Sequence, residues 1–341
     1  MMTYLDTTAS IFDVSVSRSG PDALRISWKT KHKKLRICIY HGTTPETTQR
    51  KIPFKFIKDQ TAVIISKLDP KVPHYFKVVP EGGKTIIVGE RRLPLQKTVN
   101  SRDLGGYETA DGHRVKWGKV FRSDHLARLS IDDIAFLKQL KIQTVCDFRT
   151  LAEVRSRPDR FPADEHGSYI HLPVNHLKFE PALLFEKLKN GDADWLTPQF
   201  LIRGYRLNLD QFARSWGAVF KRLADPAQLP LIFHCTGGKD RAGTFAALLL
   251  LALGVPEKTV IDDYGLSNIY IADVVNQIYA QFDIDAHYRE KISPYFSAPQ
   301  YCIEAMLSHL HDKYGSPIAY LKSKAGVTEE MLAAIRDHLL E

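Results

Sequence analysis

The chain has 341 residues, of which 44% are hydrophobic and 25% are charged, and its formal net charge at pH 7 is +8. These proportions are typical of globular proteins, and the longest apolar run, residues 246–253, is far shorter than the roughly 20 residues of a membrane-spanning helix. The four cysteines form no closely spaced pair, which argues against a disulfide framework or a cysteine zinc site. We expect Cys38, Cys146 and Cys302 to be small buried residues.

The net charge is distributed unevenly along the chain. Residues 1–97 contain 18 Lys and Arg against 8 Asp and Glu, a charge of +10, and the remainder carries −2. A basic region of this kind favours anionic partners, so we expect an anionic membrane surface or an acidic protein there and no nucleic acid, with solubility alone as the other explanation. The N-terminus lacks a basic stretch followed by an apolar core, which predicts a cytoplasmic protein by default, with a secreted or periplasmic location as the alternative.

Residues 1–95 are predicted to form an all-β sandwich domain. Apolar and polar side chains alternate in short segments, which is the pattern of half-buried strands. The predicted strands are 23–30, 35–42, 61–68, 74–79 and 84–90. Five or more strands at this spacing favour a β-sandwich.

This first domain resembles a fibronectin type III domain. Trp28 lies on an early predicted strand, and Leu68, Pro70 and Tyr75 match the leucine–proline–tyrosine corner of that fold. The resemblance covers about 80 residues and implies an immunoglobulin-like module that binds a partner or spaces domains. The residues of this segment show no catalytic constellation.

Residues 96–341 are predicted to form an α/β domain with a mostly parallel sheet flanked by helices, after a linker near Pro94. Ser130 precedes a segment with helical periodicity and is a typical N-cap. The predicted strands are 142–148, 168–174 and 229–235, and the predicted helices are 131–140, 181–223, 242–254 and a helical region from 257 onward with breaks near Pro294, Gly315 and Gly326. Residues 175–225 are expected to form a helical lid or part of the core.

One loop in this second domain carries the chemistry of the chain. Cys235 and Arg241 stand six residues apart between a predicted strand and a predicted helix, with Gly237 and Gly238 between them. Free backbone N–H groups at a helix N-terminus bind phosphate, and the glycines let successive N–H groups converge on one anion. Arg241 is placed to close over that anion with a bidentate guanidinium.

The same loop suits a nucleophilic cysteine. Cysteines at helix N-termini and beside arginines are favoured as thiolates. A thiolate beneath a bound phosphate attacks phosphorus to give a phosphocysteine, which water then hydrolyses. Backbone N–H groups and Arg241 supply the charge stabilisation, so we expect no metal and no other cofactor. We expect His234 to hold the loop through hydrogen bonds.

At this point the sequence resembles the protein tyrosine phosphatase superfamily, whose loop reads His-Cys-x5-Arg. It resembles more closely the atypical bacterial tyrosine and phosphoinositide phosphatases, the family of the secreted mycobacterial tyrosine phosphatase B. The segments that carry the resemblance are 100–112, 118–130, 145–154 and 234–243, and it covers nearly all of residues 98–341.

The resemblance implies a role for each loop residue. Cys235 is the nucleophile, Arg241 the transition-state clamp and Asp240 the general acid. Thr236, Gly237, Gly238 and Lys239 line the phosphate, and Lys239 in this family would read multiply phosphorylated inositol head groups. A solvated loop lysine is the other interpretation of that residue.

Asp147 is a second candidate for the acid or for substrate binding, because it ends a strand where active-site groups collect in a doubly wound sheet. It could equally be a structural partner of Arg149 or Lys239.

Ala242 departs from the family pattern, which has Ser or Thr after the arginine. That hydroxyl helps the thiolate to leave in the second step, so its absence predicts slow hydrolysis of the phosphoenzyme. Together these features predict a cysteine-dependent phosphatase acting on phosphotyrosine, and also on phosphoserine, phosphothreonine and phosphoinositides. The alternative is a weakly active or inactive phosphate-binding module docked by its basic N-terminal domain. A rhodanese-type sulfurtransferase is disfavoured by the Lys-Asp-Arg ending of the loop.

Overall fold

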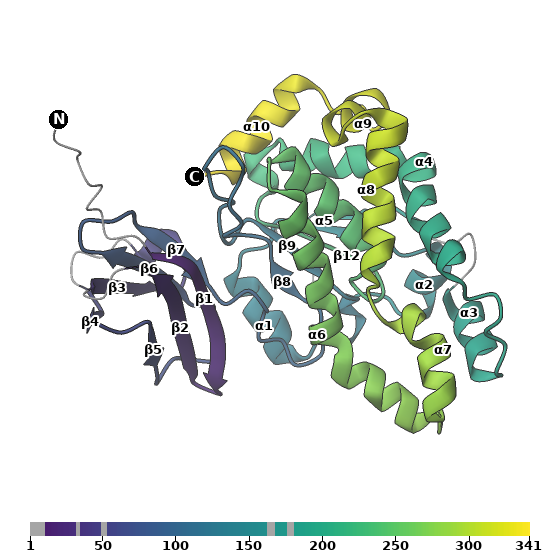
Figure 1. The fold of residues 1–341 in the computed structure, drawn as a ribbon, viewed down its shortest axis with the longest axis horizontal. Helices are drawn as coiled ribbons and strands as arrows, with labels where there is room; N and C mark the ends of the chain where they lie inside the picture. Colours follow the sequence, from purple (N-terminus) through teal and green to yellow (C-terminus); the bar gives the residue numbers. More distant parts are fainter. Residues whose placement is uncertain (1–10, 32–34, 49–52, 162–167, 176–180) are drawn as a thin grey trace.

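The structure is a computed structural model that describes residues 11–31, 35–48, 53–161, 168–175 and 181–341 (Figure 1). An antiparallel β-sandwich formed by the N-terminal residues lies beside a larger α/β domain (Figure 1). This arrangement confirms the predicted fold class.

The sandwich consists of a three-stranded and a four-stranded sheet, ordered β1-β2-β5 and β4-β3-β6-β7. Every pairing within both sheets is antiparallel. The strands are β1 (Ile11–Gly20), β2 (Ala23–Thr30), β3 (Arg36–Gly42), β4 (Lys55–Lys58), β5 (Ala62–Ile65), β6 (Tyr75–Pro80) and β7 (Ile86–Gly89). Alternate side chains such as Ile26, Trp28 and Ile37 point inward and form one core.

The corner before β6 is built differently from the prediction. His74 is buried, and its Nε2 lies 2.8 Å from the carbonyl oxygen of Asp69, five residues upstream. This is the backward hydrogen bond that a tyrosine makes in immunoglobulin-like corners. Tyr75 is also buried, but its hydroxyl group lies against the second domain, near Asp103. The assignment of Tyr75 to the corner was therefore wrong by one residue.

The second domain contains a five-stranded sheet in the order β11-β10-β12-β9-β8. The strands are β8 (Arg102–Asp103), β9 (Val120–Ser123), β10 (Thr144–Asp147), β11 (Ser168–His171) and β12 (Leu231–His234). The pairs among β11, β10, β12 and β9 are parallel, and β8 is antiparallel to β9. The carboxyl ends of β10 and β12 therefore meet at one edge, where Asp147 pairs in register with His234.

Helices cover both faces of this sheet. The described helices are α1 (Ile131–Gln139), α2 (Leu151–Ser156), α3 (Pro181–Lys189), α4 (Pro198–Leu223), α5 (Asp240–Ala252), α6 (Glu257–Gln281), α7 (Ala286–Phe296), α8 (Gln300–Tyr314), α9 (Pro317–Ser323) and α10 (Glu329–Leu339). Phe121, Val145 and Ile232 pack with α1 on one face. The larger core on the other face contains α4, α5 and α8, which lie near one another in Figure 1.

Sequence periodicity placed most of these helices correctly. Ser130 caps α1, as the sequence predicts, and the structure adds a full capping box with Asp133. The region from residue 257 contains a break that was not predicted, where α6 ends at Gln281. Pro294 lies inside the last turn of α7, so the break expected there falls after Phe296.

The predicted lid region, residues 175–225, contains α3 and α4, and residues 176–180 lie outside the described residues. Much of α4 belongs to the core, since Tyr205, Trp216 and Phe220 are almost fully buried. Trp195, which precedes α4, is only partly buried and contacts the rings of Phe200 and Tyr295. The core interpretation therefore holds for most of α4.

Trp117 connects the two domains. Its side chain is buried in the core of the sandwich, and its Nε1 donates to the carbonyl oxygen of Ile87 on β7 at 3.1 Å. Gly105 packs against the backbone of Trp117. A Cβ atom added at Gly105 would lie 2.4 Å from the Cα of Trp117. Because Trp117 belongs to the second domain but completes the core of the sandwich, the sandwich is not a detachable module.

Three of the four cysteines are buried, and the described residues contain no disulfide among them. Burial raises the pKa of the Cys146 and Cys302 thiols to about 12, in keeping with their predicted role as small core residues. Cys38 is only partly buried, contrary to the prediction. Among the described helices, none has the length and apolar character needed to cross a membrane.

Candidate active site

The loop from Cys235 to Lys239 joins β12 to α5. All four residues of β12 are fully buried, which fixes the position of Cys235 at the end of a central strand. Helix α5 begins at Asp240, and Lys239 occupies its N-cap without forming a side-chain cap. The first N–H groups of α5 are thus not capped by the N-cap side chain, as anion binding at a helix N-terminus requires.

The carbonyl groups of the loop are bound from outside. Three successive loop carbonyls accept hydrogen bonds from groups on other segments. The pairs are Thr236 O with His125 N at 3.2 Å, Gly237 O with Asn100 Nδ2 at 2.9 Å, and Gly238 O with Arg122 Nη2 at 2.8 Å. Because a peptide unit points its N–H opposite to its C=O, this arrangement favours N–H groups directed toward the concave side of the loop.

Two of these donors, Arg122 and Asn100, are themselves held through one buried carboxylate. Asp263 on α6 accepts from Arg122 Nη1 at 2.6 Å, from Arg102 Nε at 3.0 Å and from the Tyr107 hydroxyl at 2.7 Å. Arg102 Nη1 in turn donates to Asn100 Oδ1 at 2.6 Å. Burial alone would raise the pKa of Asp263, but the charges of Arg102 and Arg122 hold it well below its usual range.

Arg122 also places a positive charge beneath the loop. Burial lowers the pKa of its guanidinium to about 10 and Arg102 acts in the same direction, while the negative charges of Asp263 and Cys235 oppose this shift. Arg122 therefore remains a cation at neutral pH, close enough to Cys235 to interact with its charge.

Arg241, the predicted clamp, is fixed by Glu153 on α2. Its Nη1 and Nη2 donate to Glu153 Oε2 at 2.6 Å and Oε1 at 2.8 Å, a bidentate pair. Glu153 also accepts from the Thr236 hydroxyl and closes a capping box with Thr150. Burial alone would raise the pKa of Glu153, but Arg241 lowers it to about 2. Sequence reasoning missed Glu153, although the Thr-x-x-Glu capping-box pattern was visible.

Asp147 is enclosed by other residues of the fold. Its carboxylate is fully buried and accepts from Arg149 Nη2 at 2.7 Å and from the Tyr169 hydroxyl at 2.8 Å. Arg149 Nη2 also contacts Asp159 Oδ1 at 2.8 Å. Of the two roles predicted for Asp147, the structural partnership with Arg149 is the one found, and we correct its assignment to substrate binding.

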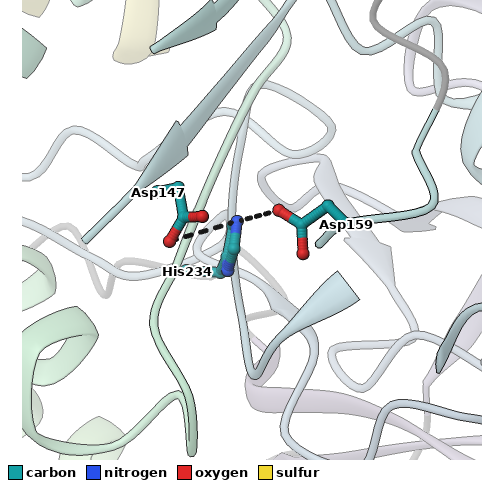
Figure 2. A group of neighbouring side chains, drawn as sticks. All are labelled: Asp147, Asp159 and His234. Carbon is teal, nitrogen blue, oxygen red and sulfur yellow. Dashed lines mark ion pairs between the residues drawn. The ribbon is translucent and has the colours of Figure 1, made fainter. Parts of the chain in front are cut away.

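His234 joins the same buried ion network, and Figure 2 shows it between Asp147 and Asp159. Its Nε2 lies 3.0 Å from Asp159 Oδ2 and 3.8 Å from Asp147 Oδ1. Burial opposes protonation, but the two carboxylates raise the pKa of His234 above its ordinary value. These three side chains have the spacing of a metal-binding group. Since Arg149 contacts both carboxylates and His234 lies beside them, we assign the network to structural support of the loop.

The loop lysine and aspartate have partners of their own. Lys239 Nζ donates to the carbonyl oxygens of Tyr295 at 2.5 Å and Ser297 at 2.6 Å, at the C-terminal end of α7. In this conformation Lys239 therefore joins α7 to the loop, and its contact with an inositol phosphate stays a prediction. Asp240 Oδ1 accepts from the Tyr205 hydroxyl at 2.6 Å and lies 3.6 Å from Lys239 Nζ.

The two loop glycines are not equivalent. Gly238 has φ +68°, and a Cβ atom there would lie 2.6 Å from the backbone nitrogen of Asp124. Gly237 has no positive φ, and a Cβ atom added there would lie 3.8 Å from its nearest neighbour, Lys239 Cγ. Only Gly238 therefore needs to be glycine for the loop to fold.

Ala242 is fully buried in the first turn of α5. The next hydroxyl, that of Thr244, donates to Asp240 O at 3.0 Å and accepts from Asn208 Nδ2 at 2.9 Å. Because these contacts hold Thr244 on the side of α4, it does not replace the hydroxyl missing at position 242.

Comparison with known proteins decides the family. Residues 93–341 match the family model described as "Tyrosine phosphatase family". The chain belongs to the tyrosine phosphatase family. Its reaction class is accordingly that of a protein-tyrosine phosphatase, a phosphoric monoester hydrolase.

Several bacterial relatives agree with this assignment. A protein of Cupriavidus necator, named as belonging to the tyrosine-protein phosphatases, is 32% identical over 56% of this chain and 68% of its own length. The "Tyrosine-protein phosphatase" of Nostoc commune is 28% identical over 64% of this chain and 73% of its own length. The "Triple specificity protein phosphatase PtpB" of Mycobacterium tuberculosis is 30% identical over 54% of this chain and 74% of its own length.

Solved structures similar to the sandwich include a fibronectin type III domain of human collagen XX. It is 14% identical, covers 26% of this chain and 98% of its own chain, and has a TM-score of 0.19. A score this low carries no argument, so the description of the first domain depends on its own strand pairing.

The glycine comparison gives the first prediction. Gly238→Ala should lower the free energy of unfolding by about 1–3 kcal/mol, because alanine is strained at positive φ and its Cβ meets the backbone of Asp124. Gly237→Ala is the matched control and should stay within about 0.5 kcal/mol of the wild type. Urea denaturation of both variants measures this difference. Equal destabilisation by the two substitutions would contradict the described loop conformation.

The Glu153–Arg241 pair gives a pH-dependent prediction. The pKa of Glu153 falls from 4.5 to about 2 on folding, so its carboxylate stabilises the folded state above pH 4.5 and this contribution is lost as pH falls toward 2. Glu153→Gln should therefore cost about 2 kcal/mol at pH 7, after allowance for solvent screening, and much less at pH 3. Urea denaturation at both pH values checks this, with the exposed Glu186→Gln as control. A cost that does not change with pH would contradict the ion pair.

Proposed function

We propose that the chain hydrolyses phosphotyrosine through a phosphocysteine on Cys235, with phosphoserine, phosphothreonine and phosphoinositides as further candidate substrates. The observation that carries this proposal is the loop itself. Its carbonyls are bound from behind, Arg241 is fixed by Glu153, and a cysteine stands at its base beside the cation of Arg122. This geometry suits a phosphate dianion held by N–H groups above a nucleophile.

In the proposed first step the Cys235 thiolate attacks phosphorus as Arg241 binds two phosphate oxygens. The S–P bond forms while the bond from phosphorus to the tyrosine oxygen breaks, and Asp240 transfers a proton to the leaving oxygen. In the second step Asp240 accepts a proton from water. The oxygen of that water attacks phosphorus, and the S–P bond breaks to release phosphate and the thiolate.

The surroundings of Lys239 favour an aromatic phosphate ester over a multiply phosphorylated inositol. The Lys239 ammonium donates to two carbonyls at the end of α7, which leaves fewer of its three N–H donors for additional phosphates. The ring of Tyr295 lies near Lys239 and contacts the Trp195 ring, with centroids 6.4 Å apart. Aromatic side chains near the loop are suitable partners for the ring of phosphotyrosine.

Ala242 makes the second step testable. We expect p-nitrophenyl phosphate to give a burst of nitrophenol followed by slow steady turnover, and Cys235→Ser to abolish both phases. Ala242→Thr should raise the steady rate by up to about tenfold relative to Ala242→Val, because the two side chains have similar volume and only threonine supplies the hydroxyl. Rapid-mixing kinetics measure both phases. Equal steady rates for the threonine and valine variants would contradict a missing-hydroxyl defect.

The sandwich offers a candidate docking surface, which we call the β4 face. Phe54 and Phe56 are two residues apart at the edge of the four-stranded sheet and are 54% and 73% exposed. In the sheet register Phe56 pairs with Cys38, and Lys58 pairs with Arg36 on the same outer face. The β4 face thus combines two exposed aromatic rings with flanking cations, in a region of charge +10.

We propose that the β4 face docks the protein on an anionic membrane. Aromatic rings bind at the boundary between head groups and acyl chains, and lysine and arginine side chains attract acidic lipids. This proposal places the catalytic domain near a membrane surface without requiring a lipid substrate. An acidic protein partner would need the cations but not the exposed phenylalanines, which favours the membrane.

Co-sedimentation with vesicles tests the docking proposal. The protein should bind vesicles of phosphatidylcholine with phosphatidylserine and not phosphatidylcholine alone. The double variant Phe54→Ser, Phe56→Ser should lose most of this binding while keeping its activity on p-nitrophenyl phosphate. The control Phe12→Ser removes an exposed aromatic ring from the opposite sheet and should bind normally. Point variants are needed because deletion of the sandwich would uncover Trp117. Equal binding to neutral vesicles, or binding unaffected by the double variant, would contradict the proposal.

A further inference from the structure

Two buried tyrosines extend from the core to Asp240. Tyr205 on α4 and Tyr264 on α6 are each 1% exposed. The Tyr205 hydroxyl lies 2.6 Å from Asp240 Oδ1 and 2.5 Å from the Tyr264 hydroxyl. Three side chains from three helices therefore form one continuous chain of hydrogen bonds that ends at a loop residue.

The direction of this chain follows from the number of protons. A tyrosine hydroxyl has one hydrogen to donate, and a carboxylate can only accept. If Tyr205 donates to Asp240, the hydrogen between the two tyrosines must come from Tyr264. Burial and the charge of Asp240 raise the pKa of both tyrosines well above its usual value, so both keep their hydrogens at neutral pH.

We propose that Tyr205, supported by Tyr264, is a positioning residue that orients the carboxyl group of Asp240 for proton transfer to the leaving oxygen. This inference rests on the proposed function, in which Asp240 is the general acid. Tyr205 itself does not touch the reacting atoms. It acts by fixing the rotation of the Asp240 side chain about its Cβ–Cγ bond.

The contacts of Asp240 indicate which oxygen carries the proton. Tyr205 and the Lys239 ammonium both lie next to Oδ1, so the proton of the acid form belongs on Oδ2. The Asp240 side chain is 25% exposed, whereas both tyrosines are closed off from solvent. Oδ1 is thus held on the buried side by the Tyr205 hydroxyl.

Charge decides when Asp240 carries that proton. In the free enzyme, the N-terminus of α5 and Lys239 favour the carboxylate. A dianionic phosphate in the loop has the opposite effect, because a neighbouring negative charge favours the neutral acid. Tyr205 is a neutral partner throughout, so its contribution is orientation in both protonation states.

A second contact from α4 provides a structural control. Asn208, three residues after Tyr205, donates through Nδ2 to Thr244 Oγ1 at 2.9 Å and is fully buried. Loss of this contact should disturb the packing of α4 on α5 about as much as loss of the Tyr205 hydroxyl. Through Thr244 it reaches the backbone carbonyl of Asp240 and not the carboxyl group. Asn208→Ala therefore separates a general loosening of α4 from misplacement of the acid.

The test compares kcat/KM for p-nitrophenyl phosphate with kcat/KM for phenyl phosphate. For each substrate, kcat/KM reports formation of the phosphoenzyme and not its hydrolysis. Phenol is the poorer leaving group and depends more on a proton from the acid. Asp240→Asn should lose about a hundredfold or more on phenyl phosphate and much less on p-nitrophenyl phosphate. Tyr205→Phe should show the same pattern at about tenfold, and the double variant should be no worse than Asp240→Asn alone. Asn208→Ala should change both substrates equally.

Each outcome has a separate meaning. If the wild type turns over neither substrate, the proposed function fails, whatever Tyr205 does. If Asp240→Asn loses equally on both substrates, Asp240 is not the acid and the role of Tyr205 falls with it. If Asp240→Asn shows the leaving-group dependence but Tyr205→Phe loses equally on both, or adds fully to Asp240→Asn, the inference about Tyr205 alone is overturned.

Discussion

The buried carboxylate of Asp263 is the contact on which the phosphate loop depends. It binds Arg122 directly and reaches Asn100 through Arg102. Arg122 in turn holds the carbonyl of Gly238, and Asn100 holds the carbonyl of Gly237. Two guanidinium groups sharing one carboxylate leave this cluster with an excess of positive charge. A buried excess of positive charge is costly unless an anion compensates for it, so the cluster favours a bound anion such as phosphate.

A second set of ion pairs supports the loop from the other side. Glu153 fixes Arg241 in a bidentate pair, and the network around Arg149 holds His234 next to Cys235. Many of these groups have little exposure, so solvent screens them less than it would a surface ion pair. Catalysis by preorganised charges needs this rigidity, because donors that are already in place do not have to reorganise during the reaction.

Local sequence patterns were sufficient to predict the loop and most of the fold. The strand, the helix and the cysteine–arginine spacing lie within about 20 consecutive residues, so periodicity and turn chemistry could locate them. Asp263 could not be assigned a role this way, because its partners Arg102 and Arg122 lie 161 and 141 residues away in the chain. Pairings of that kind appear only once the topology brings β8, β9 and α6 together.

The partners of charged side chains are the part of the site that the sequence did not show. Asp147 was expected at the substrate because it ends a strand where active-site groups collect, and Lys239 because the family resemblance implies a contact with inositol phosphates. In the folded protein Arg149 binds Asp147, and the carbonyls at the end of α7 bind Lys239. A sequence shows which charges are available, but it does not show which of them the fold has already paired. His74 is a similar case, since its hydrogen bond to Asp69 depends on the path of the backbone at the corner.

The central claim is that phosphate is transferred to Cys235 within this loop. The most direct measurement is rapid quenching during turnover of an aryl phosphate, followed by peptide mapping of the phosphorylated protein by mass spectrometry. The account predicts a phosphoryl group on the peptide that contains Cys235, attached to sulfur and formed within the burst phase. Turnover with no such adduct in the burst phase, or with the phosphoryl group on another residue, would contradict it.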